Sequence, residues 1–156
     1  MTDSNMAIEI RQLELDEVLT LFTDEHLAHA AEVRSSTFQL DYNPNFATYE
    51  ALYLDGSFVP LAAYIDGEFA GYLNIIANPS MIDKDTFVAI ADGFYVSPKY
   101  RRAGVMQDLV AHAEQLCKTS GIHSLSLSVM HGLGGGEEFV SSLGYTPAEV
   151  TFTKIL

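Results

Sequence analysis

The sequence is poor in cysteine and in basic residues. Cys117 is the only cysteine among 156 residues, so neither an internal disulfide nor a cysteine-based metal site is available. Its place in an apolar helical stripe predicts a buried side chain rather than a nucleophile. Only 8 Lys and Arg residues stand against 21 Asp and Glu residues. The chain therefore lacks the basic face that nucleic-acid binding requires, which argues against such a partner.

Long apolar runs are also missing. No stretch approaches the ~20 apolar residues of a membrane-spanning helix, and residues 1–5 do not resemble a signal peptide. We therefore expect a cytoplasmic protein with no membrane partner. The composition, 48% hydrophobic and 19% charged, predicts one folded domain over residues 1–156. The net charge of −13 suits a cationic substrate such as an amine, although solubility alone also explains it.

The most informative stretch is residues 96–121. A strand ends at Val96, a basic turn follows at residues 99–102, and Gly104 opens an amphipathic helix that ends at Gly121. The first amides of a helix lack intrahelical partners, and the helix dipole favours negative charge there. This order of elements predicts an anion site at the start of the helix. The alternative is an ordinary strand–turn–helix corner with surface arginines.

Hydrophobic periodicity predicts an α/β fold, in which one mixed, mostly antiparallel sheet carries helices on both faces. Strands are expected at residues 6–13, 58–65, 68–77, 86–96, 124–130 and 145–156, and helices at 16–33, 44–54, 105–121 and 137–143. The turn Asp66-Gly67 predicts a hairpin, whereas the later strand–helix–strand connections require parallel pairing. Asp92 and Gly93 interrupt an apolar strand, which predicts a β-bulge.

In element order, and above all over residues 94–117, the chain resembles the GNAT superfamily of acyl-CoA-dependent N-acetyltransferases. Residues 101–106, Arg-Arg-Ala-Gly-Val-Met, are similar to the family's pyrophosphate loop, and residues 138–145 resemble its last helix. The resemblance implies acetyl-CoA (coenzyme A) as the cofactor. The cofactor-binding residues would be Phe94, Tyr95, Val96, Arg101, Arg102, Ala103, Gly104, Val105, Met106 and Gln107.

Three features depart from the family's pattern. Met106 stands where the family has Gly or Ala, and Val140 stands where many members have the tyrosine that protonates the leaving thiolate. Leu133 and Gly136 take the places of a usual asparagine and alanine. These departures keep a second interpretation open, in which a catalytically weakened GNAT-fold module binds coenzyme A or regulates a partner.

The reaction that the resemblance implies transfers acetyl directly to an amine of a small molecule, peptide or protein. The amine must be neutral to attack, and an unperturbed lysine-like amine titrates near ~10.4, so a general base is useful. Asp92 is the candidate base, and shaping the bulge at Gly93 is an equally good explanation of it. A free amide near Phe94 or Val96 would stabilise the oxyanion.

Several other side chains have two interpretations each. Tyr145 and His131 are candidates for the general acid. The alternative for Tyr145 is core packing, and the alternative for His131 is simple exposure to solvent. Tyr42, Tyr49 and Tyr53 lie in the segment that covers the acceptor in such folds, where they either line a pocket or pack. His26 and His29 lie one helical turn apart, but no third ligand is evident, so we predict boundary or solvent histidines and no metal site. Edge strands in this fold often pair between subunits, which would allow a homodimer.

Overall fold

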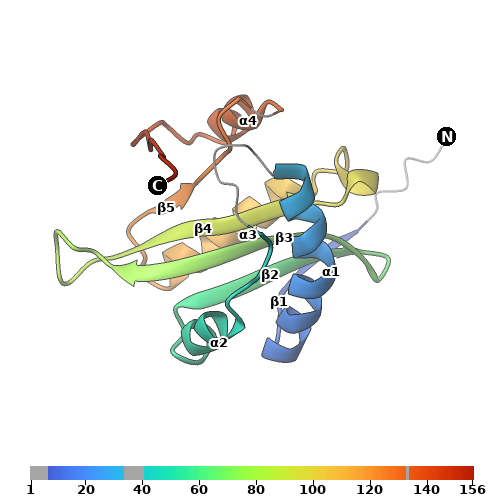
Figure 1. The fold of residues 1–156 in the computed structure, drawn as a ribbon, viewed down its shortest axis with the longest axis horizontal. Coiled ribbons are helices and arrows are strands. Elements are labelled where there is room, and N and C mark those ends of the chain that lie inside the picture. The colour runs from blue at the N-terminus through green and yellow to red at the C-terminus, as the bar shows by residue number, and fades with distance from the viewer. Residues whose placement is uncertain (1–6, 34–40, 133) are drawn as a thin grey trace.

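A five-stranded sheet of order β1-β2-β3-β4-β5 forms the centre of the computed structural model, which describes residues 7–33, 41–132 and 134–156 (Figure 1). The strands are β1 (Ile8–Gln12), β2 (Phe58–Ile65), β3 (Glu68–Pro79), β4 (Phe87–Val96) and β5 (Leu125–Leu127). Strands β1 to β4 pair antiparallel, and β5 pairs parallel with β4. The expected mixed, mostly antiparallel sheet is confirmed.

Helices cover both faces of the sheet (Figure 1). They are α1 (Leu15–Val33), α2 (Phe46–Leu54), α3 (Val105–Thr119) and α4 (Gly136–Ser142), with a short 3-10 turn η1 (Pro98–Tyr100) after β4. Phe22 of α1 packs with Phe58 and Tyr72 of the sheet in one apolar cluster, whereas Leu109 of α3 belongs to a second cluster with Leu73. Adjacent residues of β3 thus serve opposite faces, as strand alternation requires.

Local sequence signals account for several of these elements. Asp66 and Gly67 both have positive φ, 51° and 79°, as the two central residues of a type I′ hairpin turn do. Asn45 caps α2, because its side chain accepts a hydrogen bond from the Thr48 amide at 3.2 Å. Cys117 is buried in α3, and burial raises the pKa of its thiol. Within the described ranges, no helix is both long and apolar enough to cross a membrane.

The expected sixth strand over residues 145–156 is wrong. In the described structure this segment has no regular secondary structure, and Val150, Phe152 and Leu156 are exposed. A strand needs a neighbouring edge, and β5 spans only Leu125–Leu127 instead of the expected 124–130. An edge this short offers few backbone groups to pair with, so alternation in the sequence is not sufficient to form the strand.

Candidate active site

The candidate site begins where β4 and β5 separate. Their parallel pairing starts at Ala89 opposite Leu125 and ends at Ala91 opposite Leu127. On the other side of β4, Asn74 pairs with Gly93 and Ile75 pairs with Ala91, which leaves Asp92 without an opposite residue. The predicted bulge at Asp92 and Gly93 is therefore confirmed. Among the described residues, no strand pairs with the β5-facing edge of β4 beyond Ala91.

The bulge decides which amides face this open edge. Before it, the Ala89 amide donates to the Ser124 carbonyl, on the β5 side; after it, the Ser97 amide donates to the Ala70 carbonyl, on the β3 side, both at 2.9 Å. Because successive amides along a strand point to opposite sides, the amides of Phe94 and Val96 face the open edge. Two unpaired backbone donors beside a bulge are suited to hold an oxyanion.

A second set of free amides lies at the start of α3. Gly104 is the residue before the helix and has a φ of 80°, a left-handed conformation that favours glycine. The Ala103 amide donates to the Tyr100 carbonyl and the Asp108 amide to the Gly104 carbonyl. The intervening amides of residues 105–107 are the ones that helix geometry leaves without intrahelical acceptors. A Cβ at Gly104 would meet nothing within 4 Å, so an anion has room to approach.

Two of the basic side chains that precede α3 form ion pairs with acidic residues. Nη2 of Arg101 donates to both carboxylate oxygens of Glu32 in α1, at 2.7 and 2.6 Å, and Nε of Arg101 donates to the Val96 carbonyl. Lys99 pairs with Glu68 at 2.6 Å. Arg102 is exposed and has no ion pair within the described part of the chain. Backbone amides, rather than the Arg101 side chain, are therefore the groups of this segment that are available to an anion.

The ion pair between Arg101 and Glu32 leads to a prediction for the affinity for coenzyme A. The Glu32→Gln variant should bind coenzyme A about two- to fivefold more tightly, because an exposed ion pair is weak and Arg101 would be released toward the phosphates. Arg101→Ala should weaken binding by a similar factor. Titration calorimetry at low and high salt measures both effects, which should shrink as salt increases. Equal affinities of the wild type and both variants would show that Arg101 does not contact the cofactor.

On the α1–α2 face of the bulge, Asp92 accepts a hydrogen bond from the Tyr49 hydroxyl at 2.7 Å. Burial and the neighbouring Asp92 raise the pKa of Tyr49, so its proton stays in place. The Asp92 carboxylate itself is exposed. It is thus an accessible proton acceptor that is oriented by a neutral donor. Tyr49, one of the tyrosines expected either to pack or to line a pocket, contacts Asp92 directly.

Two histidines of α1 hold the neighbouring residues of β3. The Tyr72 hydroxyl is hydrogen-bonded to Nδ1 of His29, and Nδ2 of Asn74 is hydrogen-bonded to Nε2 of His26 at 3.0 Å. Burial lowers the pKa of His26 to about 3 and also lowers that of His29, so both rings are neutral near pH 7. The expected boundary position is confirmed, because both side chains are partly buried, and both histidines form hydrogen bonds within the protein. Among the described residues, no three metal-ligating side chains converge.

Sequence reasoning missed Tyr72 and Asn74. They lie in an apolar run that is typical of a buried strand, where a tyrosine suggests only packing. Asn74 carries a usable signal, because an asparagine is rare in such a strand and a buried amide requires hydrogen-bond partners. Which partners it finds depends on α1, 48 residues earlier in the chain.

Neither of the two candidate acids is hydrogen-bonded to Asp92 among the described residues. The Tyr145 hydroxyl donates to Glu114 of α3 at 3.0 Å, and burial together with Glu114 raises its pKa. Tyr145 packs against the α3 face of the sheet, whereas Asp92 contacts α2 on the other face. His131 is almost fully exposed and pairs with Glu137 at 3.2 Å. Asp92, Tyr145 and His131 thus each have a different hydrogen-bond partner, namely Tyr49, Glu114 and Glu137.

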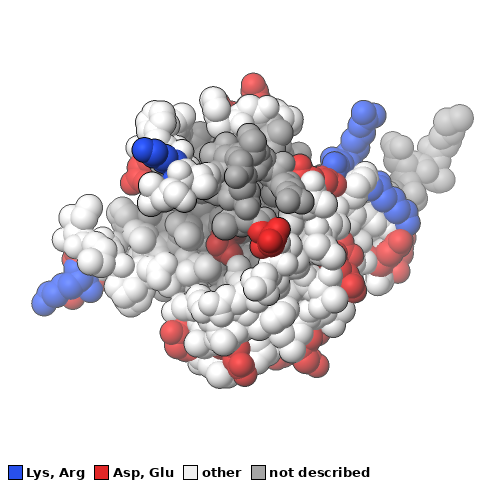
Figure 2. Space-filling model, in the orientation of Figure 1, with Lys and Arg blue, Asp and Glu red and all other residues white. Residues whose placement is uncertain are grey.

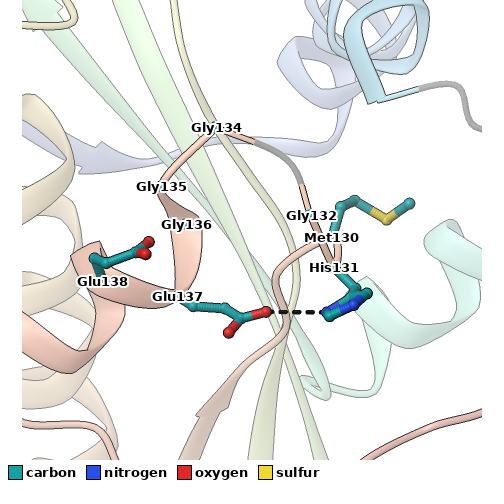
Figure 3. Close-up of a pocket in the computed structure, with 8 residues that line it drawn as sticks. All are labelled: Met130, His131, Gly132, Gly134, Gly135, Gly136, Glu137 and Glu138. Atoms are coloured by element: carbon teal, nitrogen blue, oxygen red, sulfur yellow. Dashed lines mark hydrogen bonds and ion pairs between the residues drawn. The ribbon is translucent and has the colours of Figure 1, made fainter.

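His131 lines an open cavity of 340 Å³ in the glycine-rich turn before α4 (Figure 3). Its other walls are Met130, Gly132, Gly134, Gly135, Gly136, Glu137 and Glu138. Gly136, one of the positions that depart from the resembled family, packs closely: a Cβ there would lie 3.2 Å from the Val129 Cβ. Leu133, the other, lies outside the described residues. Met106, in the first turn of α3, is partly buried and packs against the core.

Comparison with known proteins places these features in context. Residues 15–145 match the acetyltransferase (GNAT) family. A ribosomal-protein-alanine N-acetyltransferase from Brucella melitensis superposes with a TM-score of 0.74 at 16% identity, over 96% of this chain and 99% of that one. A soil metagenomic aminoglycoside acetyltransferase in complex with sisomicin gives 0.74 at 14% identity, over 96% of each chain. Glucosamine-6-phosphate N-acetyltransferase from Arabidopsis thaliana gives 0.71 at 15% identity, over 96% and 98%. No curated protein matches the sequence.

Proposed function

Because the chain belongs to the GNAT acetyltransferase family, we propose that it is an N-acetyltransferase that transfers the acetyl group of acetyl-CoA to an amine. The observation that carries this proposal is the separation of β4 and β5 at the Asp92 bulge. It leaves the Phe94 and Val96 amides unpaired on the strand that leads directly to the amides at the start of α3. One continuous stretch thus offers an oxyanion site and a phosphate site.

The residues of this stretch fit acetyl-CoA. The amides of residues 105–107, together with Gly104 and the exposed Arg102, would hold the pyrophosphate. The open edge of β4 would hold the thioester end, with the Phe94 and Val96 amides near the carbonyl oxygen. When bound, acetyl-CoA would supply an acetyl group activated as a thioester. The chain's own residues would bind the substrates and accept the proton.

Asp92 is proposed to accept the proton that the amine gives up. A C–N bond forms, the C–S bond breaks, and Asp92 passes the proton to solvent while the thiolate takes one up. A thiol with a pKa near ~8.5 leaves without a dedicated acid at neutral pH. The Tyr145 hydroxyl is hydrogen-bonded to Glu114, whereas His131, the other candidate acid, lines an open cavity.

The acceptor is proposed to be cationic. Among the charged side chains on the face that carries α1 and α2, acidic ones prevail, and basic ones lie toward its edges (Figure 2). A surface of this sign attracts amines that carry positive charge. Aminoglycosides, which one structural neighbour is named for acetylating, belong to this class.

A binding experiment and an activity experiment test the proposal together. Acetyl-CoA at ~100 times its Kd should stabilise the protein by about 2.7 kcal/mol, which raises Tm by about 2–4 °C for each kcal/mol in a domain of this size. A panel of primary amines should then release free thiol, which a thiol reagent measures. No Tm shift at millimolar acetyl-CoA would refute the proposal. A Tm shift without thiol release would favour the second candidate, a module that binds coenzyme A without turnover. Two observations favour this candidate: Val140 stands in place of a tyrosine, and the Tyr145 hydroxyl is hydrogen-bonded to Glu114.

A further inference from the structure

A second cavity lies on the α1 side of the sheet. It has a volume of 260 Å³ and is formed by α1 and the two strands of the β2–β3 hairpin (Figure 1). Its floor is apolar and contains the rings of Tyr64 and Phe69. Phe69 comes six residues before Ile75, which lies beside the bulge, so the cavity is about 20 Å away from the bulge along β3. A ligand in this cavity would therefore not occupy the site proposed for the amine.

The rim of this cavity is acidic. Glu17, Asp24 and Glu25 of α1 line it, and of the described residues that line it none is basic. Among the described residues, neither Asp24 nor Glu25 forms an ion pair. Burial and the adjacent charge of Asp24 raise the pKa of Glu25. A cation bound here would therefore relieve the repulsion between two neighbouring carboxylates.

Two walls of the cavity bind a cation that belongs to the chain itself. The Arg11 guanidinium lies 4.8 Å from the centre of the Tyr64 ring and donates to both carboxylate oxygens of Glu17, at 2.9 and 2.6 Å. This hydrogen bonding lowers the pKa of Glu17 to about 2. An aromatic face and a carboxylate are the two partners that suit a planar guanidinium.

The remaining walls offer the same two kinds of group without a cation. The Phe69 ring packs edge to face with Tyr64, at 6.2 Å between ring centres, and no described cation lies over it. Phe69 shares the cavity with the carboxylates of Asp24 and Glu25. The volume of 260 Å³ is slightly below the usual ~300–1,000 Å³ of small-molecule pockets, so it suits a group the size of one long side chain.

We propose that this cavity is a binding site for the guanidinium group of an alkylguanidine, with the cation against Phe69 and paired with Asp24 and Glu25. The alkyl chain would pack on the apolar floor beside Leu13 and Leu21. The inference goes beyond the proposed function and does not depend on it, because neither acetyl-CoA nor a residue of the candidate active site takes part. A free small molecule and an arginine side chain of a peptide both carry this group.

A matched pair of ligands tests the site. N-acetylarginine amide carries the guanidinium but no free amine, so it cannot be acetylated, and N-acetylcitrulline amide is its uncharged counterpart. In an NMR titration of the full chain, we expect the arginine compound to bind with a Kd of about 1–10 mM and to shift the amide signals of Phe69 and Glu25. The citrulline compound should bind at least about tenfold more weakly.

A short peptide identifies the source of the guanidinium. An N-acetylated peptide amide with one arginine between two alanines offers the same group together with peptide bonds. Tighter binding of this peptide than of N-acetylarginine amide supports the site with a peptide as its ligand. Equal or weaker binding of the peptide supports the site with a free alkylguanidine as its ligand.

Three variants locate the binding. Asp24→Asn combined with Glu25→Gln should weaken binding of N-acetylarginine amide about tenfold or more, and Phe69→Leu should weaken it about three- to fivefold through loss of the ring face. Asp85→Asn combined with Glu149→Gln is the matched control, because it removes two exposed charges that do not line the cavity and should keep the wild-type Kd. Equal binding of the arginine and citrulline compounds, an unchanged Kd in the Asp24 and Glu25 double variant, or signal shifts confined to the candidate active site would each refute the proposal.

Discussion

Replacing Asp92 with asparagine is expected to lower kcat for amine acetylation by about 10²–10⁴-fold, the usual contribution of a positioned general base. The carboxylate is exposed, lies at the bulge where β4 leaves β5, and has the Tyr49 hydroxyl as its donor. Asparagine keeps an oxygen that accepts this hydrogen bond. It cannot accept a proton from the amine, so the loss should fall on the chemical step.

Two accompanying measurements separate catalysis by Asp92 from a role in shaping the bulge. The Asp92→Asn variant should keep the Tm shift with acetyl-CoA, because the cofactor amides belong to other residues. Tyr49→Phe removes the donor but leaves the carboxylate, so it should lower kcat far less. If Asp92→Asn loses acetyl-CoA binding together with activity, the carboxylate serves the shape of the bulge. Full activity of Asp92→Asn would remove it from the mechanism.

The second large effect is expected at Gly104, where a glutamate should weaken acetyl-CoA binding by about 100-fold or more. The φ of 80° disfavours any residue with a Cβ, at roughly 1–2 kcal/mol. A carboxylate beside the free amides of residues 105–107 would add repulsion of the phosphates and would itself occupy the positive end of the helix. The strain lowers the stability of the fold with or without the cofactor, whereas the carboxylate specifically opposes cofactor binding.

Gly104→Ala is the matched control, because it introduces the same backbone strain without the charge. It should lower Tm to a similar degree and weaken acetyl-CoA binding only slightly, since a Cβ at this position meets no neighbouring atom. Calorimetry with acetyl-CoA measures the difference between the two variants. Equal affinities for the alanine and glutamate variants would mean that the anion site is not at the start of α3.

Much of the fold was predictable because its signals are local. The Asp66-Gly67 turn, the apolar run of β4 with its interrupting Asp92 and Gly93, and the glycine before α3 each depend on the conformational preferences of neighbouring residues. The segment 145–156 shows the limit of such reasoning. Its alternating pattern is compatible with a strand, but a strand also needs a partner edge, and the short β5 does not supply one.

The candidate site likewise combines features that the local sequence predicts with contacts that only the tertiary structure shows. The sequence by itself determined the family, the hairpin turn, the bulge and the strand–turn–helix order at Gly104, because these arise from residues that are close together in the chain. Only the tertiary structure decided that Arg101 pairs with Glu32, 69 residues away, that the Tyr145 hydroxyl donates to Glu114, and that His26 is hydrogen-bonded to Asn74. Hydrogen bonds and ion pairs between distant segments depend on how helices pack on the sheet, and no local pattern encodes that packing.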